Sequence, residues 1–182
     1  MTRFIAASAL VLALFASVAA AQPAVQTAPG DLLDPRTYAP ESKPFLTVHA
    51  IGVQRYTCLP NGTWSTAPEA VLYDPTNPEK ALGTHFLNFS TGRPVWQFKD
   101  GSSVEAARKA SASGGAGNIA WLLLQATDTS SGSDGDRLRH TTWVQRLNTS
   151  GGVAPTGTCT PGDSVAVPYE TDYVFWKATG DE

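Results

Sequence analysis

The chain has 182 residues, of which 42% are hydrophobic and only 16% are charged, and its formal net charge at pH 7 is −3. This length suits one domain with a sizeable core, and an acidic balance without a basic patch argues against nucleic acid as a partner. Gly, Pro, Ser and Thr are plentiful, which favours strands and turns over helices.

Residues 1–21 have the pattern of a secretory signal peptide. Arg3 supplies a positive charge, residues 4–18 are apolar, and Ala19–Ala21 form a small-residue cleavage site. We expect the mature chain to begin at Gln22, which leaves about 160 residues with 12 basic and 16 acidic side chains, a net charge of −4. The apolar run is short for a membrane anchor and no later stretch could span a bilayer, so the sequence predicts a secreted, extracellular protein.

Residues 22–43 are rich in Pro and Ala and predict an extended, partly mobile arm ahead of a single domain at residues 44–182. Short apolar or alternating runs, separated by turn signals, follow along this domain. The strand candidates are residues 45–50, 53–58, 70–73, 82–89, 94–98, 119–124, 138–147 and 165–177. Gly52 is expected to mark a bend or bulge.

No segment has a sustained 3.6-residue apolar repeat. The sequence therefore predicts an all-β, single-domain sandwich or barrel of about eight to ten short strands, with at most one short helix near residues 105–110. Residues 119–124 are continuously apolar and predict a strand that is buried on both faces. Residues 165–177 alternate between two faces and are expected to close the domain.

Cys58 and Cys159 are the two cysteines of the chain. In a secreted protein this even count predicts one disulfide, which would staple the domain, and two free thiols are the alternative. No Cys-x-x-Cys or His-x-x-x-His spacing supports a metal site, so no metal and no cofactor is predicted. Three N-glycosylation sequons, at Asn61, Asn88 and Asn148, favour a glycoprotein, although Asn61 also precedes a glycine in a typical hairpin turn.

The best candidate constellation combines His85 and Asp100, with Asp172 as a further carboxylate. A histidine beside a carboxylate can act as a general base or bind a metal, and the carboxylate would raise the pKa of the imidazole above about 6.5. Trp96 and Trp64 are the candidates for ligand binding, because a tryptophan can stack on a sugar ring.

Each of these residues also has a purely structural interpretation. His85 would be hydrogen-bonded within a strand pair, Trp96 would pack in the core, and Asp100 would close an Asx-type turn on Ser102. Convergence of the three side chains in one open pocket would favour a catalytic site.

Several sequence blocks, in a fixed order between residues 45 and 176, carry a family resemblance. They are Gly52–Cys58 followed by Trp64, Gly83 and His85; Pro94-x-Trp96 with Asp100-Gly101-Ser102; Trp121–Leu124; Gln145-Arg146 with Thr149-x-Gly151-Gly152, Pro155 and Cys159; and Tyr169, Asp172, Tyr173 and Phe175. Together they resemble an uncharacterised secreted family of bacteria and fungi, the domain of unknown function numbered 3455. Ala120 and residues 87–93 depart from its pattern. The resemblance implies secretion and a single domain, and it implies no reaction.

The sequence contains no Gly-x-Ser-x-Gly elbow, no His-Glu-x-x-His motif, and no phosphate or dinucleotide fingerprint. We therefore predict a secreted β-domain of unknown activity that acts as a non-enzymatic binding or cell-surface module. Its candidate partners are a cell-wall glycan or an extracellular surface. The alternative is a small secreted hydrolase or metal-dependent enzyme centred on His85 and Asp100.

Overall fold

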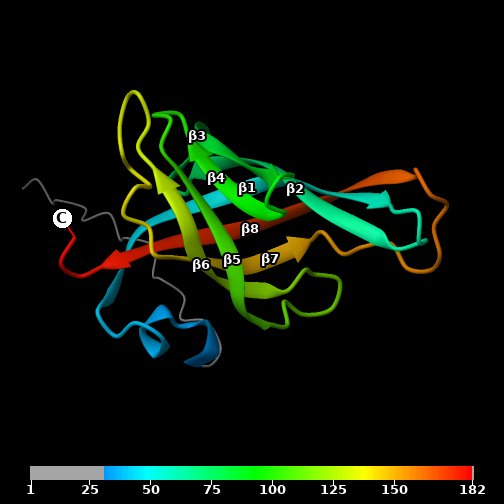
Figure 1. Ribbon diagram of the computed structural model, residues 1–182, viewed down its shortest axis with the longest axis horizontal. Coiled ribbons are helices and arrows are strands. Elements are labelled where there is room, and N and C mark those ends of the chain that lie inside the picture. The colour runs from blue at the N-terminus through cyan, green and yellow to red at the C-terminus, as the bar shows by residue number, and fades with distance from the viewer. Residues whose placement is uncertain (1–30, 182) are drawn as a thin grey trace, which may run out of the picture.

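The computed structural model describes residues 31–181; the predicted signal peptide, its cleavage site and residues 22–30 lie outside this range. Eight strands follow one another: β1 (Ser42–Cys58), β2 (Trp64–Asp74), β3 (Asn77–Asn88), β4 (Arg93–Phe98), β5 (Ser103–Ala112), β6 (Trp121–Ser130), β7 (Trp143–Gly151) and β8 (Ser164–Ala178). Each strand is antiparallel to the next, and β8 pairs with β1, so the sheet closes into a barrel (Figure 1). The all-β prediction is confirmed, and of its two alternatives the structure is the barrel.

Strand β1 replaces the two short strands that the sequence predicted. Gly52 lies within this strand opposite Ala70, and a Cβ atom at Gly52 would come within 2.1 Å of the Glu69 carbonyl oxygen. The glycine therefore permits a close approach of β2 and marks no bulge. The irregularity in β1 lies instead between Pro44 and Leu46, beside a proline that has no N–H to donate.

Strand β5 occupies the segment in which the sequence allowed at most one short helix, and no helix forms there. Val104 and Ala106 are fully buried and alternate with more exposed neighbours, as the pleat of a strand requires. The strand pairs with both β4 and β6, and without it the barrel could not close. Closure of the sheet therefore overrides the weak helix preference of the Ala, Arg and Lys residues in this segment.

Residues 31–41 lie on the outer face of the barrel, in contrast to the extended arm that the sequence predicted. They contain two short 3-10 turns, η1 (Asp31–Leu33) and η2 (Pro35–Thr37). Leu33 is fully buried against the outer side chains of β6, β7 and β8. The amide nitrogen Nε2 of Gln145 donates to the Leu33 carbonyl at 2.6 Å, and Trp176 Nε1 donates to Gln145 Oε1 at 2.7 Å. These bonds fix the segment to the barrel wall.

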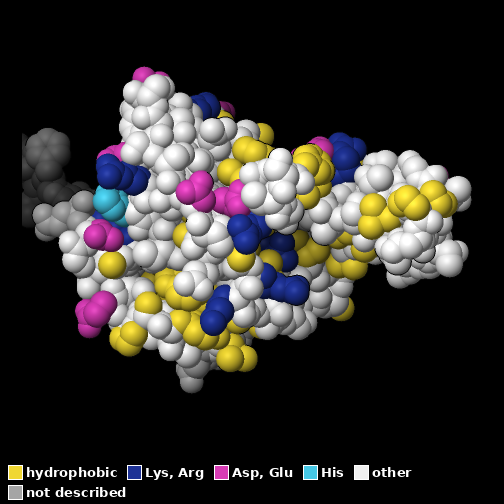
Figure 2. All heavy atoms as spheres, viewed as in Figure 1, with side chains coloured by type: hydrophobic (Ala, Val, Ile, Leu, Met, Phe, Trp, Pro, Cys, Tyr) yellow, Lys and Arg dark blue, Asp and Glu magenta, His cyan; other side chains and the backbone are white. Residues whose placement is uncertain are grey.

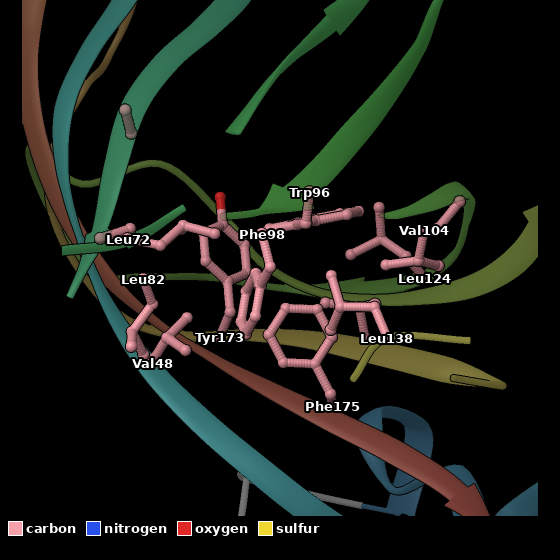
Figure 3. Packing of buried hydrophobic residues seen from close by; sticks show 14 of the residues in the cluster. Val48, Leu72, Leu82, Trp96, Phe98, Val104, Leu124, Leu138, Tyr173 and Phe175 are labelled. Carbon is pink, nitrogen blue, oxygen red and sulfur yellow. The ribbon is translucent and has the colours of Figure 1, made fainter. Parts of the chain in front are cut away.

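The barrel interior holds the main hydrophobic core (Figure 3). In the close view the rings of Trp96, Phe98, Tyr173 and Phe175 lie between aliphatic side chains from both sides of the barrel. Strand β6 contributes to both cores, because Leu124 points inward while Leu123 lies under Leu33 on the outer face. The prediction of a strand buried on both faces for residues 119–124 therefore holds at Leu123 and Leu124, whereas Ile119 and Ala120 precede the strand.

The connections between strands are arranged differently at the two ends of the barrel. At one end, Leu138 from the β6–β7 connection is fully buried near the β4–β5 turn. We call this end the closed end. At the other end, the β1–β2 turn and the β7–β8 connection extend beyond the barrel as a projection (Figure 1). The predicted disulfide between Cys58 and Cys159 joins these two segments, with the Cα atoms 5.9 Å apart. None of the helical turns in residues 31–181 is long and apolar enough to cross a bilayer.

Candidate functional site

His85 lies inside the barrel on β3 and is 3% exposed. Its Nδ1 atom is 2.8 Å from the carbonyl oxygen of Val95 on the neighbouring strand β4. Because a carbonyl oxygen can only accept a hydrogen bond, Nδ1 carries the proton and Nε2 is left as an acceptor. The imidazole stacks on Trp96 at 4.4 Å between ring centroids and meets the edge of Tyr173 at 5.0 Å.

The charge state of His85 follows from its burial. Burial lowers the pKa of the His85 imidazole to about 3, the bond to the Val95 carbonyl opposes this shift, and the nearby charge of Arg146 adds to it. The expectation of a raised pKa is therefore wrong, because no carboxylate contributes. At neutral pH the imidazole is uncharged, and a group with this pKa is a weak general base.

Asp100 does not contact His85. Its Oδ1 atom accepts hydrogen bonds from the backbone N–H and the hydroxyl of Ser102 at 2.9 and 2.6 Å, and Oδ2 accepts from the Arg137 backbone at 3.3 Å. Asp100 thus closes the β4–β5 turn, as expected if its role is purely structural. It lines a different hollow, of about 360 Å³, beside Lys80 and Arg137.

Asp172 also lies apart from His85, on the outer face of β8. The alternation of that strand turns Thr171 and Tyr173 inward, so Asp172 faces outward. Its Oδ1 atom is 2.8 Å from Nδ1 of His49, and its Oδ2 atom accepts a hydrogen bond from Asn148 at 2.8 Å. The three candidate catalytic residues therefore do not share one pocket.

His85 and Trp96 do share a pocket, of about 220 Å³, at the barrel end from which the projection extends. We call this end the pocket end. The pocket is lined by Gln54, Thr66, Pro68, His85, Leu87, Gly92, Pro94, Trp96, Leu122, Leu124, Arg146 and Tyr173. These residues come from β1, β2, β3, β4, β6, β7, β8 and the β3–β4 turn, and most of them are apolar.

Three buried polar atoms of this lining have no hydrogen-bond partner in the protein. They are Nε2 of Gln54, Nε1 of Trp96 and the hydroxyl of Tyr173. Burial raises the pKa of the Tyr173 hydroxyl, and although the charge of Arg146 opposes this, the hydroxyl stays protonated and can donate. The large majority of buried polar side-chain atoms in native proteins are hydrogen-bonded, and three of the seven exceptions among the described residues belong to this lining, which makes the pocket the candidate site for a ligand.

Arg146 adds a positive charge to the same pocket. It lies on β7 between Leu122 of β6 and Tyr173 of β8, and it is half-buried. Its Nε and Nη2 atoms donate to the carbonyl oxygen of Ala120 at 3.0 and 2.8 Å, so the side chain is held in place. Arg146 and Gln54 lie in the blocks that carry the family resemblance, but nothing in the sequence marked them as pocket residues, so neither was a site candidate. Tyr173 could have been found from the alternation along β8.

The remaining candidates lie elsewhere. Trp64 is half-buried at the start of β2, and its Nε1 atom is also without a partner. A larger hollow, of about 600 Å³, lies between Tyr38 and the outer residues of β6, and of its lining residues only Thr141 has a buried polar atom without a partner among the described residues. Within residues 31–181, no group of three or more His, Cys, Asp or Glu side chains could hold a metal ion.

A family model described as "Protein of unknown function (DUF3455)" matches residues 39–177. No curated protein and no solved structure matches the chain. The matched range covers the eight strands almost completely, and so it contains the whole pocket lining.

Proposed function

Because the chain belongs to the DUF3455 family of proteins of unknown function, whose description names no reaction, we propose its function from the site alone. The protein is a secreted, non-enzymatic binding protein that takes one small ligand into the pocket end of the barrel. The observation that carries this proposal is the set of three buried, unpartnered polar atoms of Gln54, Trp96 and Tyr173 around one pocket.

The size of the pocket suits a small molecule. The interior of an eight-stranded barrel is just wide enough to be filled by side chains or to hold one small ligand. A dry apolar cavity of about 150 Å³ is known to admit benzene, so about 220 Å³ can accept a single ring or a short chain with a polar group. Apolar walls with a few fixed polar groups are typical of ligand pockets.

The pocket favours a binding role over catalysis. His85 and Asp100 line different hollows, and the imidazole is neutral and already bonded to Val95. A cell-wall glycan would need an exposed aromatic platform, whereas Trp96 is 1% exposed. These observations support a small ligand held inside the barrel in place of a polymer bound on its surface.

Secretion is the second part of the proposal. It is supported by the signal-peptide pattern of residues 1–21 and by the disulfide, since disulfides persist in oxidising compartments. Of the three sequons, Asn61 suits a glycan best, because it is exposed in the projection and only its Oδ1 atom is hydrogen-bonded, to Thr63. Asn88 and Asn148 use Nδ2, the atom of glycan attachment, to bond Glu105 and Asp172.

The proposal is tested by calorimetric titration of the purified protein with a panel of ring-sized and short-chain molecules. Binding of at least one member at a one-to-one ratio is the expected result, and Tyr173→Phe should weaken it by removing one polar group from the pocket. Tyr73→Phe is the matched control, because Tyr73 is a half-buried tyrosine that does not line the pocket. Absence of binding across the panel, or an equal effect of the two substitutions, would overturn the proposal.

A further inference from the structure

The charge balance around Arg146 is unusual for a half-buried cation. Buried or partly buried charges in proteins are normally paired. Among the described residues, no Asp or Glu oxygen forms an ion pair with Arg146 within 4.0 Å, whereas Arg36, Arg55 and Arg93 each have such a partner. The guanidinium bonds the Ala120 carbonyl and lies beside the neutral Tyr173 hydroxyl, and neither group supplies a counter-charge.

The three unpartnered polar atoms of the lining have the same preference, whereas His85 Nε2 is an acceptor. The unpartnered Nε2 of Gln54 and Nε1 of Trp96 can only donate hydrogen bonds, and the Tyr173 hydroxyl is able to donate. The lining contains no carboxylate at all. A neutral ligand would satisfy some of these donors, but only an anion would also supply the missing charge.

We propose that the ligand of the pocket is a small organic acid, with its carboxylate on Arg146 and its ring or short apolar chain against the aliphatic lining. This inference rests on the proposed binding function and names the chemical class of the ligand. A planar carboxylate matches the guanidinium fork, and such charge-assisted hydrogen bonds are roughly twice as strong as neutral ones.

The rest of the lining determines which apolar groups of the acid would fit. Leu87, Pro94, Leu122 and Leu124 provide the aliphatic walls, and the stacked rings of His85 and Trp96 form an aromatic side. A volume of about 220 Å³ accommodates a benzoate or a six-carbon chain and leaves no room for a sugar polymer. The carboxylate would also be the only negative charge within the pocket, so a diacid would place a second, uncompensated charge among apolar groups.

The projection beside the pocket has few charged side chains, which is compatible with the entry of an anionic ligand from that side. Residues 56–66 and 152–162, which form most of that projection, contain no charged side chain. Figure 2 shows the projecting end almost free of acidic and basic side chains, in contrast to the body of the molecule. No acidic cluster therefore stands at this end to repel an anion.

The test compares acids with their neutral amides, which have nearly the same shape. The probes are benzoate with benzamide and hexanoate with hexanamide, titrated into the full protein at pH 7 by calorimetry. We expect one acid of these pairs to bind about ten- to hundredfold more tightly than its amide, the range for a hydrogen bond to a charged group.

Two variants test whether Arg146 causes the preference for the acid. Arg146→Gln removes the charge but keeps a donor for the Ala120 carbonyl, whereas Arg146→Lys keeps the charge.

The control is Arg55→Gln, which changes the net charge equally but lies on the outer face, paired with Glu69. Arg146→Gln should reduce acid binding to the level of the amide, Arg146→Lys should retain part of the preference, and Arg55→Gln should leave it unchanged. If Arg146→Gln does not fold, the wild-type pairs and Arg146→Lys still decide the question. Equal binding of acid and amide would overturn this inference and leave the binding function standing. If none of the four probes binds but other neutral molecules do, the organic-acid inference is likewise overturned and the binding function stands. If no molecule binds, both the organic-acid inference and the binding function are overturned.

Discussion

The closed end and the pocket end of the barrel are filled in different ways. At the closed end Leu138 and Phe175 are fully buried, and the buried Ser102 hydroxyl accepts from the Leu138 backbone and donates to Asp100. At the pocket end Gln54 and Tyr173 leave polar atoms unpartnered. The unpartnered donors of the pocket lining therefore lie at the pocket end, whereas the unpartnered Thr141 hydroxyl, close to Leu138, lines the outer hollow. Since each such donor costs stability, its retention is best explained by a ligand.

The two largest expected effects are similar in size, and the first concerns the disulfide at the pocket end. Replacing Cys58 and Cys159 by serine together should lower the free energy of unfolding by about 4 kcal/mol, because the bond closes a loop with a sequence separation of 101. Chemical denaturation of the oxidised wild type and the double variant measures this loss. An unchanged midpoint would mean that the pocket end is stabilised without the bond.

The second prediction compares the packing of the two ends directly. Phe175→Ala should cost about 3 to 5 kcal/mol, because the ring is fully buried and its loss leaves a cavity. Leu87→Ala should cost much less, since Leu87 is half-buried and already faces the pocket. Urea denaturation gives both values, and similar losses would show that the two ends are packed alike.

The third prediction uses the titration of His85. Its folded-state pKa of about 3 lies below the unfolded value of 6.5, so as pH falls below 6.5 the unfolded chain binds a proton that the folded chain does not. The stability from the neutral imidazole is complete above pH 6.5 and is lost as the pH falls toward 3. Between pH 7.5 and 5 this loss is about 2 kcal/mol.

The non-titrating variant His85→Gln isolates this contribution. Thermal and urea melts of both proteins at pH 7.5 and pH 5 should show a smaller loss for the variant, by about the same 2 kcal/mol. Parallel pH dependence in the two proteins would contradict a buried, neutral His85.

The last prediction concerns the loss of one hydroxyl at each end, which should change the free energy of unfolding in opposite directions. Tyr173→Phe removes a buried hydroxyl without a partner and should raise the free energy of unfolding by about 1 kcal/mol in the absence of ligand. Ser102→Ala should lower it by about 1 to 3 kcal/mol, because the Leu138 N–H and Asp100 lose their partner. Destabilisation by both substitutions would show that the Tyr173 hydroxyl is satisfied after all.

Much of the fold could be predicted from the sequence because it depends on local patterns. The alternation of β8 and the apolar run of β6 identified the strands that close and fill the barrel. The even cysteine count identified the bond between Cys58 and Cys159. The segment of β5 could not be recognised, since its strand conformation comes from pairing with β4 and β6 and not from its own residues.

The site was harder to predict because it depends on which side chains share the barrel interior. His85 and Trp96 were identified by residue type, and their proximity follows from the β3–β4 register, which no motif reveals. Asp100 was misplaced because a carboxylate in a turn and a catalytic carboxylate look the same in sequence. Arg146 was noted only as part of a family block, since only the closed barrel shows that it lines the pocket without an acidic partner.

The pairing of β1 with β8 has a consequence for the way the protein is made. Seven of the eight strand pairings join neighbours along the chain, and the eighth joins the first strand to the last. During synthesis β1 therefore emerges long before its second partner, and its edge stays unpaired until β8 has been made. Exposed strand edges promote aggregation, and long-range pairing is slow. Export of the chain before β8 is complete would postpone barrel closure, and with it the Cys58–Cys159 bond, until the protein has left the cytosol.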